Sequence, residues 1–110
     1  MATGYYGART SQYENQITLN IDLTVDSSAS STTQYRSKVY FFTNKGASSN
    51  YEYLDFGSVS PGQSVTYTKL YSSMLYNTLY TFRGYLQDYW GGGYQESGED
   101  TGWHTGSASF

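Results

Sequence analysis

The chain of 110 residues carries a formal net charge of −3, contains no cysteine and has only six basic residues. This length accommodates one folded domain, and the lack of cysteine excludes a disulfide framework, a zinc–thiolate site and a thiol nucleophile. Nucleic acids and acidic membrane surfaces are not expected as partners, because both require a concentrated basic surface.

The first segment, residues 1–14, lacks an apolar run and is expected to form an N-terminal arm that orders on docking. It has no hydrophobic region of a secretory signal, and no later stretch is long and apolar enough for a membrane span. We therefore expect one folded domain over residues 15–110, located in a virion or outside a cell.

The clearest predicted strand lies within residues 16–26, where apolar and polar side chains alternate without interruption. A period of two is typical of an antiparallel strand that buries one face. The apolar set expected to face the core consists of Ile17, Leu19, Ile21, Leu23 and Val25. The Ser/Thr-rich segment that follows predicts a polar loop.

Residues 34–44 also have strand character. The side chains expected to face inward are Tyr35, Val39 and Phe41. Tyr40 and Phe42 make the opposite face partly apolar as well, whereas Arg36 and Lys38 are expected to face water. This segment therefore predicts a strand with one buried face and one mixed face.

Two strands are predicted at residues 51–59 and 64–71, with the sequence Ser-Pro-Gly-Gln between them. Pro61 presets φ at the second position of a turn, and Gly62 accepts the positive φ that a type II turn requires at the third. The spacing thus predicts a tight turn between two strands, the first of which buries Leu54 and Phe56.

A long strand is predicted over residues 79–90. The side chains expected on its inner face are Tyr80, Phe82, Leu86 and Trp90. Gly84 within it predicts a bulge or the close approach of another backbone. The segment before it, residues 72–78, is compatible with a short helical turn or a crossover, and residues 101–110 predict a final strand.

Six or seven strands without an amphipathic helix predict an all-β fold, an antiparallel β-sandwich. The stretch FGSVSPGQSVTYTKLY resembles the strand–turn–strand of immunoglobulin-like and fibronectin-III-like modules, and LYTFRGYLQD resembles their long late strand. The resemblance covers residues 17–90 and implies an immunoglobulin-like sandwich, without the cysteine pair of antibody domains. Residues 1–42 are similar in their Tyr/Ser-rich character to bacteriophage tail proteins, which implies a virion component.

The stretch DYWGGGYQESGED, residues 88–100, combines three glycines with aromatic and acidic side chains. It is compatible with a ligand loop, a metal site or a hairpin tip, and we favour a mobile hairpin tip. A calcium site would use several carboxylates of this loop, because Ca²⁺ takes many oxygen ligands. Its candidate ligands are Asp88, Glu96, Glu99 and Asp100. The spacing of an EF-hand is missing, so we expect neither a metal nor a cofactor.

Catalysis is not expected. His104 is the only histidine, and no G-x-S-x-G nucleophile motif accompanies it. The carboxylates predicted on strands lie outside apolar runs that would raise their pKa. His104 is therefore expected to pack or form a hydrogen bond beside Trp103.

Fourteen tyrosines are the strongest functional signal. Their rings suit protein interfaces and also stack on sugars. The candidate binding residues are Tyr85, Tyr89, Trp90 and Tyr94. The main hypothesis is a non-catalytic module that binds other virion or assembly proteins and copies of itself, as a head-decoration, tail or baseplate component. The alternative is a carbohydrate-binding module that recognises cell-surface glycans.

Overall fold

The structure is a computed structural model that describes residues 3–43, 50–72, 78–102 and 104–108. These residues form strands and no helix, so none of them lies in a helix that could cross a membrane. The strands are β1 (Thr3–Tyr13), β2 (Gln16–Val25), β3 (Thr33–Thr43), β4 (Asn50–Val59), β5 (Ser64–Tyr71), β6 (Thr78–Trp90), β7 (Gly93–Asp100) and β8 (His104–Ala108).

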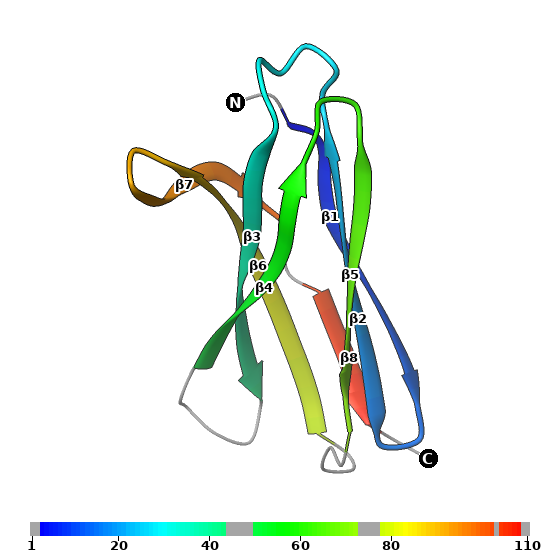
Figure 1. The fold of residues 1–110 in the computed structure, drawn as a ribbon. Coiled ribbons are helices and arrows are strands. Elements are labelled where there is room, and N and C mark those ends of the chain that lie inside the picture. Colours follow the sequence, from blue (N-terminus) through cyan, green and yellow to red (C-terminus); the bar gives the residue numbers. More distant parts are fainter. Residues whose placement is uncertain (1–2, 44–49, 73–77, 103, 109–110) are drawn as a thin grey trace.

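The strands form two antiparallel sheets that pack face to face (Figure 1). Sheet A has the order β1-β2-β5, and sheet B has the order β4-β3-β6-β7, with β8 also paired to β6. The predicted all-β architecture is confirmed. The described strands number eight rather than six or seven, because Thr3–Tyr13 and Gly93–Asp100 also form strands, and β7 shares one edge of sheet B with β8.

The core between the sheets follows the alternation in the sequence. The inner side chains of β2 are 0–1% exposed, and Val39, Phe82 and Leu86 of sheet B face them with the same degree of burial. Burying one such side chain contributes roughly 1.5–3 kcal/mol relative to leaving it exposed. Leu54 is buried as predicted, whereas Phe41 and Phe56 are partly buried against the core.

The expected N-terminal arm is a strand. Thr3–Tyr13 forms β1, which pairs with β2 along its length, so this part of residues 1–14 belongs to the sandwich. Its inner face contributes Tyr6 and Ala8 to the core, and on its outer face Arg9 holds Asp22 of β2 through two hydrogen bonds of 2.7 and 2.9 Å. The sequence underpredicts this strand because its two buried side chains, a tyrosine and an alanine, give no clear apolar alternation, and its pairing with β2 is not visible in the local pattern.

The turn between β4 and β5 carries the chain from sheet B to sheet A. Gly62 has φ +82°, and the N–H of Gln63 donates to the carbonyl of Ser60, as the predicted type II turn requires. The N–H of Gly62 also donates to the carbonyl of Val25 at 2.8 Å. The turn is thereby fastened to the end of β2.

Gly84 marks a close approach, but of side chains, where the sequence predicted another backbone. A Cβ atom at this position would lie 2.7 Å from Ser37 Oγ and 2.9 Å from the Tyr6 hydroxyl. These two hydroxyl groups are buried and hydrogen-bonded to each other between the sheets. The segment predicted as a helical turn or crossover falls largely on residues 73–77, outside the described residues.

Candidate binding face on sheet B

The stretch from Asp88 to Asp100 is a β-hairpin that projects from the sandwich (Figure 1). Trp90 pairs with Gly93, and the two residues between them, Gly91 and Gly92, have φ of +65° and +88°. A two-residue turn with positive φ at both positions matches the twist of the flanking strands. The predicted hairpin is confirmed, but its reversal is shorter than expected, because the residues after Gly92 already form β7.

The prediction that Trp90 faces the core is wrong. Trp90 continues the alternation of Phe82 and Leu86, yet its side chain is 60% exposed. The hairpin extends past the sandwich at this point, so sheet A no longer covers that side of the strand (Figure 1). Alternation predicts the side on which a residue lies, but another layer must be present to bury it.

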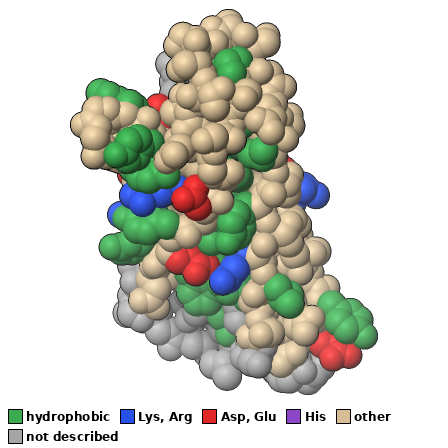
Figure 2. Space-filling model, in the orientation of Figure 1, with side chains coloured by type: hydrophobic (Ala, Val, Ile, Leu, Met, Phe, Trp, Pro, Cys, Tyr) green, Lys and Arg blue, Asp and Glu red, His purple; other side chains and the backbone are tan. Residues whose placement is uncertain are grey.

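The outer face of sheet B carries a continuous set of rings, here called the aromatic face. Its members are Tyr40 and Phe42 on β3, Tyr51 and Tyr53 on β4, Tyr85 and Tyr89 on β6, and Tyr94 on β7. Tyr40 connects three strands, because its ring lies 5.7 Å from that of Tyr51 and 5.6 Å from that of Tyr85. Hydrophobic and cationic side chains gather beside the hairpin in Figure 2.

Arg36 holds the aromatic face together at the base of the hairpin. Its guanidinium carbon lies 3.8 Å from the ring centre of Tyr53 and 3.9 Å from that of Tyr94. Its Nε donates to the side-chain oxygen of Gln87 at 2.7 Å, and the Gln87 amide donates to Glu96 at 2.9 Å. Arg36 lies on the outer face as expected, but rings from β4 and β7 leave it only partly exposed.

Lys38 makes a second contact of this kind. Its Nζ lies 4.3 Å from the ring centre of Tyr51 and 5.2 Å from that of Tyr40. A hydrogen bond with Tyr40 raises the pKa of Lys38 above its ordinary value, so the side chain stays charged at neutral pH. Cations and rings thus alternate across β3 and β4.

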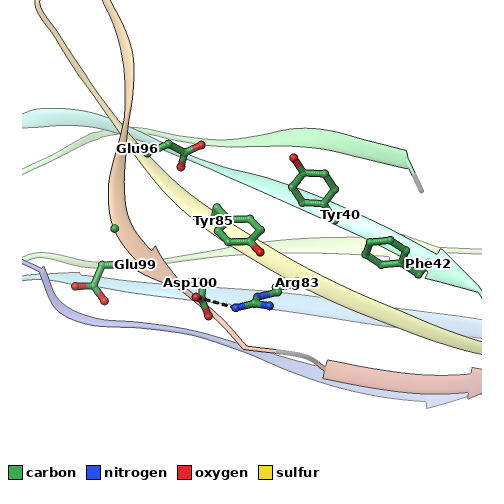
Figure 3. A pocket seen from close by; sticks show the side chains of 8 residues that line it. Tyr40, Phe42, Arg83, Tyr85, Glu96, Glu99 and Asp100 are labelled. Atoms are coloured by element: carbon green, nitrogen blue, oxygen red, sulfur yellow. Dashed lines mark hydrogen bonds and ion pairs between the residues drawn. The ribbon is translucent and has the colours of Figure 1, made fainter. Parts of the chain in front are cut away.

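A bulge in β7 opens a pocket on the aromatic face. Gln87 pairs with Glu96 and Tyr85 pairs with Asp100, so three residues of β7 oppose a single residue of β6. Gly98 at the centre of this bulge has φ +90°, which glycine adopts without strain. The pocket has a volume of about 520 Å³ and is lined by Tyr40, Phe42, Arg83, Tyr85, Glu96, Gly98, Glu99 and Asp100 (Figure 3).

The pocket is acidic on its β7 side. Arg83 forms an ion pair with Asp100, with 3.1 Å between Nη2 and Oδ2. The backbone N–H of Gly102 and then the Arg83 guanidinium lower the pKa of Asp100, which is therefore a carboxylate at neutral pH. Within the described residues, no cation pairs with Glu96 or Glu99. Three carboxylates thus face one guanidinium.

The four predicted binding residues do not form one platform. Tyr89 and Tyr94 meet edge to face at 5.2 Å across the hairpin. Tyr85 lies on the same face but four residues earlier, about 13 Å along the strand, where it lines the pocket. Trp90 alternates to the other face of the hairpin. The four residues therefore fall into three separate places: Tyr89 and Tyr94 contact each other on the hairpin, Tyr85 lines the pocket, and Trp90 is exposed on the other face.

Sequence reasoning missed the larger part of the aromatic face. Tyr51 and Tyr53 are not among the predicted binding residues, and for Tyr40 and Phe42 the sequence predicts only that they make one face of β3 partly apolar. The available signal was apolar character at both parities of β3. Because the pairing register of strands far apart in the chain is not visible in the sequence, this signal did not show which rings would meet.

The calcium candidates do not converge. Asp88 pairs with Gln95 and lies on the side of Tyr35, where it adds to the effect of burial in raising the pKa of that tyrosine. Glu96 lies on the opposite face with Gln87. Among the described residues, no group of three acidic or histidine side chains is arranged to hold a metal. Trp103 and the side chain of His104 lie outside the described residues.

Comparison with known proteins adds no relative to this description. No protein-family model, no curated protein and no solved structure matches the chain. The molecule is an all-β protein of two antiparallel sheets with an aromatic face on one of them. A function is therefore proposed from this geometry.

Proposed function

We propose that this chain is a non-catalytic binding module that acts through protein–protein contacts on its aromatic face, first of all with further copies of itself. The observation that carries the proposal is the exposure of tyrosines gathered on one side of sheet B. Tyr51 is 54% exposed, and Tyr53 and Tyr89 are each 44% exposed. Tyrosine and arginine are enriched in protein interfaces and at their energetic centres.

The aromatic face is preorganised for docking. Tyr51 and Tyr53 lie edge to face at 5.6 Å, and Lys38 and Arg36 occupy positions over their rings. Side chains that are already held lose little conformational freedom when a partner binds, and this loss is a major cost of association.

Ring geometry favours a protein partner over a sugar. A sugar needs the free face of an aromatic ring, and Arg36 already occupies one face of both Tyr53 and Tyr94. Tyr89 and Tyr94 are packed against each other at an interplanar angle of 80°. The carbohydrate-binding alternative stays a prediction and is an outcome of the test below.

The proposed fold relationship is an immunoglobulin-like sandwich. Constant-type immunoglobulin domains join strands one, two, four and five in one sheet and strands three, six and seven in the other. The order found here agrees with this division except for β4, which pairs with β3 in sheet B, and for the additional strand β8, which pairs with β6. The strand order supports the resemblance. The virion setting, as a head-decoration, tail or baseplate component, stays a prediction from sequence character.

Sedimentation velocity over a wide concentration range tests the function. We expect reversible self-association, and we expect Tyr51→Ser combined with Tyr53→Ser to weaken it at least about tenfold. Tyr13→Ser is the matched control, since Tyr13 is 72% exposed but lies on β1 of sheet A. Circular dichroism verifies that each variant folds.

Two outcomes would overturn the proposal. A wild-type chain that stays monomeric at every concentration contradicts self-association, and an equal loss in Tyr13→Ser contradicts the assignment to the aromatic face. Titration with a panel of glycans runs in parallel. A monomer whose tyrosine fluorescence responds saturably to one glycan would replace the proposal with the carbohydrate alternative.

A further inference from the structure

The pocket beside the β7 bulge has an aromatic side and an acidic side. Figure 3 shows Tyr40 and Phe42 on one side of Tyr85, and Glu96 and Glu99 on the other. The rings of Tyr40 and Tyr85 are nearly perpendicular, at 89°, so together they form a corner that presents two differently oriented π-systems. A corner of aromatic rings beside carboxylates is the chemistry that recognises organic cations.

The protein's own cations show that these rings accept positive charge. Lys38 lies over Tyr51 of β4, whereas Arg36 lies between Tyr53 of β4 and Tyr94 of β7 and is linked to Glu96 through Gln87. Among the described residues that line the pocket itself, Arg83 is the one basic side chain. Arg83 pairs with Asp100, so the negative charge of Glu96 and Glu99 is not offset by an ion pair there.

We infer that this pocket binds a lysine or arginine side chain presented by the contacting protein, an inference that rests on the proposed function. The ammonium or guanidinium group lies between Glu96 and the Tyr85 ring, and the aliphatic stem of the side chain packs along Tyr40 and Phe42. The volume of about 520 Å³ falls within the range of small-ligand sites, about 300–1,000 Å³.

The charge of the pocket separates this ligand from the alternatives. A neutral sugar can donate hydroxyl hydrogen bonds to these carboxylates, but it gains no charge–charge attraction from their excess over cations. A hard metal ion needs several converging oxygen atoms, and no three acidic side chains of the described residues are arranged to hold one. An anionic group is repelled by Glu96, Glu99 and Asp100. A cation with an apolar stem satisfies both sides of the pocket.

Nuclear magnetic resonance of the ¹⁵N-labelled full chain tests the inference at a concentration where the chain is monomeric. The cationic probes are the N-acetyl methylamides of lysine and arginine, the neutral counterparts are those of norleucine and citrulline, and glucose is the sugar. We expect the amide signals of Tyr85, Gly98 and Asp100 to shift saturably with both cations, with a Kd on the order of 10 mM.

Variants give the matched comparison. Glu96→Gln retains the size of the side chain and removes its charge, so the Kd for the cations should rise about threefold. Glu14→Gln changes the net charge equally but lies in the turn between β1 and β2, and it should leave the Kd unchanged. An equal effect in both variants would reduce the observation to general electrostatics and overturn the inference.

The remaining outcomes are decisive as well. Unmoved amides at about 50 mM cation, or equal shifts with citrulline, overturn the cation pocket. Shifts with glucose alone assign the pocket to a sugar instead. If Tyr51→Ser with Tyr53→Ser abolishes self-association while the cations do not bind, the proposed binding face is supported and the cation pocket is contradicted. If the cations bind and the chain never associates, the cation pocket is supported and self-association is contradicted.

Discussion

On the outer face of sheet A, β2 and β5 are joined by hydrogen bonds between directly opposed polar side chains. The pairs are Asn20 with Thr68 at 2.6 Å, Asp22 with Thr66 at 2.7 Å and Thr24 with Ser64 at 2.7 Å. On the outer face of sheet B, rings and cations occupy the equivalent positions. Both faces lie over the same core, and they differ only in what the alternate residues offer outward.

This difference is one ground for the proposed binding face. The short side chains of β2 and β5 satisfy one another, so docking on them would exchange existing hydrogen bonds for new ones with little net gain. Sheet A also exposes Tyr5, Tyr13 and Leu70, outside these polar pairs. The rings of sheet B are held in place but remain half exposed, so covering them removes apolar surface from water. The tyrosine surplus is therefore informative only through its location.

The largest effect is expected where the two sheets meet at Gly84. Gly84→Ala places a Cβ atom against Ser37 and Tyr6, and we expect a loss of about 1–3 kcal/mol in the free energy of unfolding. Gly93→Ala is the matched control, because nothing lies within 4 Å of its Cβ position, and its change should stay within about 0.5 kcal/mol. Urea unfolding measures both, and equal losses would contradict the close approach.

Next in size is the contrast between two arginines, one on each outer face. Arg36→Met removes a guanidinium held between two rings and should lower the free energy of unfolding by about 1–2 kcal/mol. Arg9→Met removes an exposed ion pair with Asp22 and should lower the free energy of unfolding less than Arg36→Met does. This effect should disappear in 1 M salt, because the Debye length is then about 3 Å and exposed ion pairs are screened. If Arg36→Met and Arg9→Met lowered the free energy of unfolding equally and with the same salt dependence, the two outer faces would not differ in how they hold their arginines.

A smaller effect is expected in acid, and it is common to both sheets. Hydrogen bonds lower the pKa of Asp22, mainly from Arg9, and of Asp100, mainly from the N–H of Gly102. A carboxyl group whose pKa is lower in the folded state stabilises the fold above its ordinary pKa of about 3.9, and this stability is lost as the pH falls below that value.

Unfolding measured between pH 7 and pH 2 checks this expectation. Asp22→Asn and Asp100→Asn should each flatten the decline below about pH 4, because neither variant has that proton to bind. Glu14→Gln serves as the control, since Glu14 is an exposed turn residue. A decline that is unchanged in both aspartate variants would show that other groups govern the acid response.

The smallest effect concerns the polar pairs of sheet A. A double-mutant cycle with Asn20→Ala and Thr68→Val should give a coupling energy of about 0.2–1 kcal/mol, the usual range for cross-strand pairs. The measurement is urea unfolding of the two single variants and the double variant. A coupling energy of zero would mean that the polar ladder is not part of what stabilises this face.

The core strands were predictable because each carries its own evidence. The inner residues of β2 are apolar at every second position, and Pro61-Gly62 specifies a turn through its own backbone preferences. The strand β1 was missed because its evidence lies in β2, the strand with which it pairs. The alternation predicts strands that bury one face and therefore a sandwich, whereas which strand belongs to which sheet is known only from the pairing between strands.

The candidate site was predictable only in part, and for a related reason. The sequence pointed to tyrosines around the hairpin, and three of the four predicted side chains lie on the outer face of sheet B. The pocket depends on a bulge that shifts β7 against β6, and on Tyr40 of a third strand. A shift of this kind changes which side chains are neighbours without changing the local pattern of either strand.

By itself, the sequence determined which residues alternate, where the chain turns at Pro61-Gly62 and Gly91-Gly92, and that the product is all-β. These properties follow from local backbone preferences and from the insolubility of apolar side chains. Tertiary structure alone decided that Gly84 is enclosed and Trp90 is exposed, although both lie on the same side of one strand. Burial requires a second layer, and only the packed sheets show how far along β6 that layer extends.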